Sequence, residues 1–253
     1  HRARPLAAWS AEALIEDLDS PLPARRIDAQ EELVRRGDAV RGTLQRALKA
    51  GVRSTAGETW LLWTLGRMPA VSGETEDWLV RTGSSLSFNA RIQVLRILGH
   101  RWREGLEAGP MPELLFAALS DPEARTRFAA VQSLMQARAE GAVEALDALA
   151  ARETDRLAFY AAWQALRRLA PVAALRARLS DPRGGVRRAA LLALLEEDAL
   201  VEDAVRPLLV DADAGVSGVA ALWLARRGGN PLLVVEPAPG EFTGELRVAI
   251  TPG

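Results

Sequence analysis

The residues that could carry acid–base, nucleophilic or metal chemistry are few in this chain of 253 residues. It contains no cysteine, which excludes disulfides, thiolate metal sites, cysteine catalysis and covalently attached c-type haem within the chain. Its two histidines, His1 and His100, are too few for a multi-histidine metal site. His100 follows Gly99 at the predicted end of a helix, where an imidazole is expected to cap carbonyl groups. The sequence therefore predicts no catalytic residue, no metal site and no cofactor.

The acidic and glycine-rich stretches also lack the pattern of an active site. Glu74–Asp77 and Glu196–Asp198 are expected to be solvated charge runs at helix boundaries. Gly184 and its neighbouring glycine open a helix without the lysine that a phosphate loop needs. The formal net charge of −1 gives no general reason to expect nucleic acid or acidic lipid as a partner. No apolar run reaches the roughly 18 residues of a membrane span. The sequence therefore favours binding over catalysis.

Any binding residues must be positioned by a repeat that runs through the chain. The four residues Leu119–Pro122 recur as Leu179–Pro182, 60 residues later, and a similar helix follows each copy. Such self-similarity is typical of stacked helical repeats. In this frame seven predicted helices close on a leucine: Leu33, Leu65, Leu98, Leu134, Leu166, Leu194 and Leu224. Five carry a small residue four positions earlier: Ala29, Ala130, Ala162, Ala190 and Ala220. Four carry an arginine seven positions earlier: Arg26, Arg91, Arg127 and Arg187.

This spacing predicts an all-α solenoid of about seven helical hairpins over residues 10–229, preceded by an extended lead-in at 1–9. Ser10, Asp121 and Asp181 are predicted N-caps. Pro207 is expected to shorten or kink the helix that contains it. Residues 230–253 change to β-branched and alternating apolar residues, which predicts a short C-terminal β segment. That segment is expected either to cap the last repeat or to begin a further β domain.

The recurring frame Asp-Pro-x-x-x-Val-Arg-x-Ala-Ala-x-x-x-Leu resembles the HEAT repeat, most closely the short bacterial kind of phycobilisome-lyase-like proteins. The resemblance implies a right-handed α-α superhelix whose motif helices, those that close on the leucine, line the concave face. The stretch from Arg4 through Trp9 to Asp38, together with Leu62–Leu65, resembles the HEAT segment of membrane-bound-dehydrogenase-like, haem-binding bacterial proteins. That second resemblance implies one module of a larger secreted protein, whose full-length parent could be an oxidoreductase. It favours a periplasmic or extracellular location over the cytoplasm.

If the motif helices face inward, the residues six and two positions before each closing leucine, and the residue after it, should line the groove. The candidate groove residues are Trp63, Arg96, Gln132, Tyr160, Gln164, Arg167 and Arg188. Tyr, Trp and Arg are typical anchors of protein interfaces, so we expect a protein segment or neighbouring domain to bind along the groove. The alternatives are a solvated polar face without a ligand, a HEAT-like DNA-repair or nucleic-acid-binding protein, and a regulatory or chaperone-like subunit of an enzyme complex. Among the other tryptophans, Trp60, Trp163 and Trp223 are expected to fill gaps between repeats, and Trp102 to be exposed.

Overall fold

The computed structural model describes residues 5–51, 54–69, 74–83, 86–106 and 111–227. The chain divides into two compact units, His1–Pro171 and Val172–Gly253. The helices of the first unit are η1 (Leu6–Ala8), α1 (Ala11–Asp17), α2 (Pro23–Arg36), α3 (Asp38–Ala50), α4 (Thr55–Arg67), α5 (Glu74–Gly83), α6 (Phe88–Arg103), α7 (Glu113–Ala117), η2 (Ala118–Ser120), α8 (Ala124–Gln136), η3 (Glu140–Ala142), α9 (Val143–Arg152) and α10 (Arg156–Leu169). Those of the second are α11 (Val172–Ala177), η4 (Arg178–Ser180), α12 (Gly184–Glu196), α13 (Glu202–Val205), η5 (Arg206–Val210) and α14 (Ala214–Arg227). The described residues contain no strand, and the expected β segment at 230–253 lies outside them.

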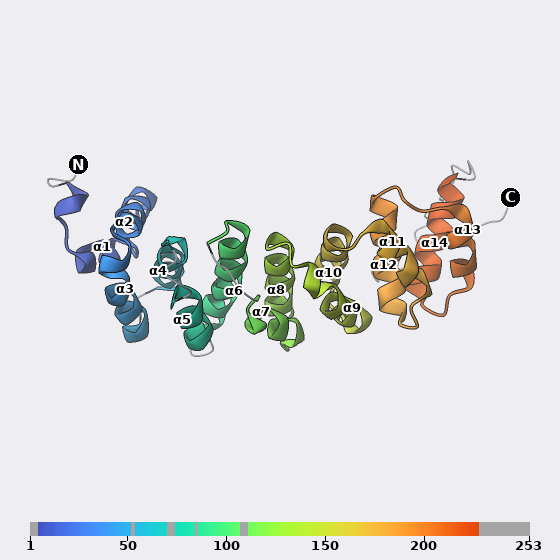
Figure 1. Cartoon of the computed structure of the whole chain (residues 1–253), viewed down its shortest axis with the longest axis horizontal. Coiled ribbons are helices and arrows are strands. Elements are labelled where there is room, and N and C mark those ends of the chain that lie inside the picture. The colour runs from blue at the N-terminus through green and yellow to red at the C-terminus, as the bar shows by residue number, and fades with distance from the viewer. Residues whose placement is uncertain (1–4, 52–53, 70–73, 84–85, 107–110, 228–253) are drawn as a thin grey trace, which may run out of the picture. The chain divides into compact units, whose positions relative to one another are not determined.

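The helices are arranged as successive hairpins. In the first unit α2, α4, α6, α8 and α10 pack each against the next, and each also packs against the α-helix that precedes it in the chain (Figure 1). In the second unit α12 packs against α14, and α11 and α13 pack on these two helices. The predicted all-α helical-repeat fold is therefore confirmed within each unit.

The repeat residues form the core of both units. All closing leucines from Leu33 to Leu194 are buried, and the small residues four positions earlier have no exposed surface. Because residues four apart lie on one face of a helix, each alanine leaves room for the neighbouring helix beside the leucine. Leu224 is half-buried on α14, the last helix of the described residues.

Two of the four motif arginines tie their helix to the turn that follows the next helix. The Arg127 guanidinium on α8 donates to both carboxylate oxygens of Glu153 at 2.7 Å, and its Nη1 donates to two carbonyl oxygens of the turn before α8. Arg187 on α12 makes the same set of bonds with Asp211 and with the turn before α12. Arg91 is exposed and contacts an aromatic ring instead. The arginine therefore anchors a repeat where a carboxylate stands opposite it.

Several local expectations need correction. Asp121 and Asp181 do not N-cap α8 and α12, which begin three residues later, at Ala124 and Gly184. Each aspartate Oδ1 accepts instead from the backbone N–H two residues further on, at 2.8 Å. The Asp-Pro order favours this Asx turn, which occupies the carboxylate that an N-cap would need. By contrast, Ser10 does cap α1.

The described part of the lead-in also differs from the prediction. It is not wholly extended, because Leu6–Ala8 form a 3-10 turn whose Leu6 carbonyl accepts from the Arg36 side chain at 2.9 Å. Pro207 lies in the 3-10 segment Arg206–Val210, and α13 ends just before it at Val205. The predicted shortening of that helix is therefore confirmed, as expected for a residue without a backbone donor.

Gly99 does not end its helix, contrary to expectation, and Gly66 does not end its helix either. Gly66 lies inside α4 and Gly99 inside α6. A Cβ on Gly99 would lie 2.6 Å from the Ser133 Cα of α8, and one on Gly66 would lie 2.5 Å from Ile97 of α6. The glycines therefore permit close helix crossings. Past Gly99, α6 carries the fully buried Arg101, whose guanidinium caps the end of α4 by donating to its Gly66 carbonyl at 2.8 Å.

Candidate functional site

The predicted groove residues fall into three groups in the structure. The first surrounds Trp63, which is half-buried on α4. Its indole Nε1 donates to Gln93 Oε1 at 3.0 Å, and its ring centroid lies 5.6 Å from that of His100. Trp63 therefore joins α4 to α6, and part of its side chain packs between these two repeats.

Helix α6 does not end at Gly99, and His100 lies in its last turns. Burial, together with the nearby guanidinium of Arg103, lowers the pKa of its imidazole below the usual value. The neutral ring is the form expected against an indole at physiological pH.

Trp102, expected to be exposed, is half-buried, as are Trp60 and Trp223, while Trp163 is buried.

The second group lies on α10. Tyr160 is 52% exposed, and its hydroxyl accepts from Gln164 Nε2 at 3.3 Å. Arg167 Nη1 donates to Gln164 Oε1 at 2.9 Å, and the Tyr160 ring packs edge-on against Trp163 with centroids 5.2 Å apart. Three of the predicted residues thus form one connected row along a single helix face, because they are spaced by four and three positions.

The remaining predicted residues are separate. Gln132 is half-buried on α8, and Arg96 is exposed on α6. Arg188 belongs to α12 in the second unit, where its side chain covers Gly215 so closely that a Cβ there would lie 2.6 Å from the Arg188 Cδ. The structure places Arg96 at the rim of a pocket.

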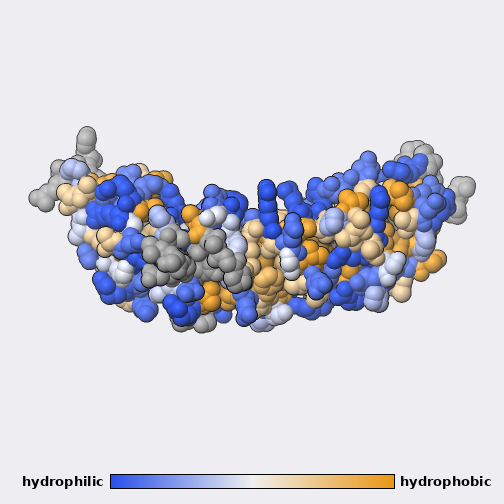
Figure 2. Space-filling view, viewed as in Figure 1, coloured by the Kyte–Doolittle hydropathy of each residue, from blue (hydrophilic) through white to orange (hydrophobic). Residues whose placement is uncertain are grey.

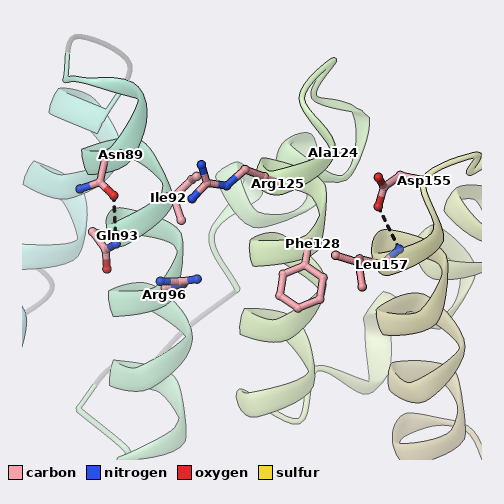
Figure 3. A pocket seen from close by; sticks show the side chains of 9 residues that line it. All are labelled: Asn89, Ile92, Gln93, Arg96, Ala124, Arg125, Phe128, Asp155 and Leu157. Atoms are coloured by element: carbon pink, nitrogen blue, oxygen red, sulfur yellow. Dashed lines mark hydrogen bonds between the residues drawn. The ribbon is translucent and has the colours of Figure 1, made fainter.

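This pocket, of about 280 Å³, opens between the N-terminal halves of α6 and α8 and the start of α10 (Figure 3). It is lined by Asn89, Ile92, Gln93, Arg96, Ala124, Arg125, Phe128, Asp155 and Leu157. Its apolar part consists of the buried Ile92, the half-buried ring of Phe128 and Leu157, which is 69% exposed. In Figure 3 the side chains of Arg96 and Arg125 extend into the space between α6 and α8. We call this set of residues the α6–α8 pocket.

Ion pairs and caps hold the walls of the pocket in place. Asp155 N-caps α10 by accepting from the backbone N–H groups of Leu157 and Ala158 at 3.0 and 2.9 Å. Just before it, Glu153 accepts from Arg127. Burial alone would raise the pKa of Glu153, but the hydrogen bonds from Arg127 and from the backbone of Asp155 outweigh it and lower that pKa. The first turn of α10 is therefore fixed against α8.

Three of the pocket side chains that sequence reasoning missed share one repeat position. Asn89, Arg125 and Leu157 each stand nine residues before a closing leucine. Positions nine, six and two before that leucine are spaced by three and four, so they lie on one helix face. Extending the predicted row by one turn toward the helix start would have found all three. Position six does supply Ile92 and Phe128, as expected.

The visible surface of the described residues is mixed in hydropathy (Figure 2). Hydrophobic side chains are visible over the region of α7 and α8, whereas hydrophilic ones dominate the upper edge in this view (Figure 2). Among the described residues no group of three His, Cys, Asp or Glu side chains is placed to hold a metal ion. None of the described helices has both the length and the apolar character needed to traverse a bilayer.

Comparisons with known proteins yield structural similarities only. No protein-family model matches the sequence, and no curated protein matches it. Among solved structures, the YibA protein of Escherichia coli is 19% identical, over 87% of this chain and 72% of that one, with a TM-score of 0.34. The complex of CpcE and CpcF of phycocyanin lyase from a Nostoc species is 15% identical, over 90% and 91%, with a TM-score of 0.43. A designed armadillo repeat protein is 15% identical, over 84% and 97%, with a TM-score of 0.28.

The fold assignment rests on the helix packing described above. The comparisons give no support to the resemblance to membrane-bound-dehydrogenase-like proteins, and the predicted module of a larger oxidoreductase stays a prediction. This chain is similar in architecture to helical-repeat proteins.

Proposed function

We propose that the chain is a protein-binding module without chemistry of its own, and that its first unit holds a segment of a partner protein. The binding face consists of the exposed sides of α6, α8 and α10. One observation carries the proposal: residues at equivalent repeat positions on three successive helices surround a pocket with an apolar base and a basic rim. Stacked repeats supply such rows of side chains as an extended surface.

The composition of this face supports a protein ligand. Tyr160 is a large aromatic residue with 52% of its surface exposed, and Gln164 links its hydroxyl to the guanidinium of Arg167. Tyrosine and arginine are enriched among the residues that dominate binding energy at protein interfaces.

The test is selection of random displayed peptides on the 253-residue chain, followed by affinity measurement of the enriched peptides. We expect Tyr160→Ala/Arg167→Glu to weaken binding at least about tenfold, since aromatic and arginine anchors each contribute on the order of 1–2 kcal/mol. The matched control is Leu22→Ala/Lys49→Glu, which also removes one exposed apolar side chain and reverses one exposed charge. It should change affinity less than twofold.

Two outcomes would overturn the proposal. One is that no peptide is enriched, or that enriched peptides bind both variants equally well. The other is tight binding to DNA that weakens steeply with added salt, which would favour the nucleic-acid alternative. Circular dichroism of each variant verifies that the helical fold is retained.

A further inference from the structure

Resting on the proposed function, we infer that the α6–α8 pocket selects segments in which an apolar side chain lies next to a carboxylate. The apolar side chain packs against Phe128 and Leu157. The carboxylate, from an aspartate, a glutamate or a chain end, is held by Arg96 and Arg125.

The size of the pocket points to a side chain. Its volume is about 280 Å³, which is at the lower limit of the roughly 300–1,000 Å³ typical of small-molecule sites. Such a space can take a leucine or phenylalanine side chain of a partner. Phe128 is half-buried and Leu157 largely exposed, so covering them would remove apolar surface from water, which favours binding.

The charges select the neighbour of that side chain. Within the described residues Arg96 makes no hydrogen bond or ion pair, and Arg125 contacts only the Phe88 ring, 5.9 Å from its centroid. The one acidic residue that lines the pocket, Asp155, is occupied in capping α10. Two guanidinium groups therefore face the pocket without a carboxylate partner. A planar guanidinium binds carboxylates through paired hydrogen bonds, and this geometry gives specificity as well as attraction.

This arrangement differs from that of Arg127 and Arg101. Arg127 donates to the carboxylate of Glu153, and Arg101 donates to two carbonyl groups of the fold. These two arginines are therefore bonded within the repeat structure, and the pair at the pocket is not. The polar wall is also held in place, because Gln93 accepts from Trp63 and donates to Asn89. A wall that is already ordered loses little entropy when a ligand binds.

An apolar base beside the arginines favours a peptide over a nucleic acid. A nucleic-acid surface is an extended basic face, whereas this site pairs two cations with three apolar side chains in a chain of net charge −1. A larger loss of nucleic-acid binding than of peptide binding in Arg96→Gln/Arg125→Gln would therefore contradict this preference.

The experiment uses the full-length protein and the peptides enriched by it from a random displayed library. We expect these peptides to contain aspartate or glutamate, or a free terminal carboxylate, within two positions of an aromatic or branched aliphatic residue. A synthetic peptide of that consensus, and its analogue with each carboxylate replaced by an amide, are then titrated by fluorescence anisotropy. The proteins are the unmodified chain, Arg96→Gln/Arg125→Gln and Phe128→Ala.

The acidic peptide should lose about tenfold in affinity for Arg96→Gln/Arg125→Gln, whereas the amide peptide, already weakened, should lose less than twofold. Phe128→Ala should weaken both peptides. The control Arg138→Gln/Arg168→Gln removes two exposed charges, one just after the C-terminal end of α8 and one in the last turn of α10. It should leave the affinity for the acidic peptide within twofold.

The two proposals fail in different ways. Enriched peptides without acidic character, or an equal loss for the acidic and amide peptides, would overturn the inference while leaving the protein-binding function intact. Failure to enrich any peptide would overturn both. If Arg96→Gln/Arg125→Gln weakens binding of a single-stranded DNA 20-mer more than binding of the peptide, the pocket is part of a nucleic-acid surface and the inference is wrong.

Discussion

Replacing Arg127 by methionine should destabilise the protein far more than its partly exposed position suggests. The guanidinium bonds both oxygens of Glu153 at 2.7 Å, and the two side chains are only 15% and 1% exposed. Methionine preserves the aliphatic packing but leaves the carboxylate buried without its cation. Breaking a buried pair in this way costs about 3–5 kcal/mol. Because Glu153 keeps its hydrogen bonds from the Thr154 and Asp155 backbones, we expect a loss of about 3 kcal/mol.

The assay is urea unfolding at pH 7, followed by circular dichroism at 222 nm. The matched control is Arg91→Met, since Arg91 stands at the same repeat position but is exposed and contacts only the Phe88 ring. Its expected cost is below about 0.5 kcal/mol. In a double-mutant cycle, Arg127→Met and Glu153→Gln should show a coupling of at least about 1 kcal/mol. Equal costs for Arg127→Met and Arg91→Met, or additive losses in the cycle, would refute the ion-pair explanation of this motif arginine.

Three further predictions concern stability. Hydrogen bonding to Arg35 lowers the pKa of Glu32 to about 2, below the roughly 4.3 of an unfolded glutamate. The contribution of Glu32 to folding stability is therefore complete above about pH 4.3 and is lost as the pH falls toward 2. The urea midpoint should fall over this pH range, and it should fall less in Glu32→Gln. Ala190→Asp places a charge at a site with no exposed surface in α12, and it should lower the free energy of unfolding in urea by more than about 3 kcal/mol. Glu31→Ala, at a side chain 58% exposed, should lower it by less than about 0.5 kcal/mol. Similar losses for the two variants would mean that the helix faces are wrongly assigned. Gly99→Val should lower the thermal midpoint by several degrees, equivalent to about 2–3 kcal/mol, and a midpoint equal to that of the unmodified protein would show that the crossing can open freely.

The sequence was sufficient to predict the repeat and its core, because helical periodicity alone determines which residues share a face. Leu134 and Ala130 are four apart, so both had to be buried once the helix was recognised. The roles of the glycines were not predictable in the same way. Gly37 ends α2 with φ of 55°, as expected of a glycine after a closing leucine turn. Gly99, directly after Leu98, lies within its helix instead. Its role depends on a crossing with α8 that no local pattern reveals.

The candidate site could be predicted in part. Positions six and two before the closing leucine identified Phe128 and Arg96. Arg125 lies one helical turn before the first of these positions, so the prediction did not include it. The N-terminal ends of motif helices become part of a pocket only because the next hairpin begins close by, and that depends on the length of the intervening turn. The wider groove from Trp63 to Arg188 stays a prediction, because its members lie in separate groups and in two units.

The glycine crossings also limit how this array can be lengthened or shuffled. Gly66 and Gly99 occupy the same place in successive repeats, directly after the closing leucine, whereas the corresponding residues on α8 and α10 are Met135 and Arg167. A copy of the α8 repeat inserted between α4 and α6 would bring a methionine side chain to a contact where even a Cβ has no room. The repeats are thus alike in sequence frame but not interchangeable as building blocks. Insertion or duplication of a repeat should be tolerated after α8 and not before it. A consensus repeat averaged over the chain would lose the two glycines that allow the close helix crossings of α4 with α6 and of α6 with α8.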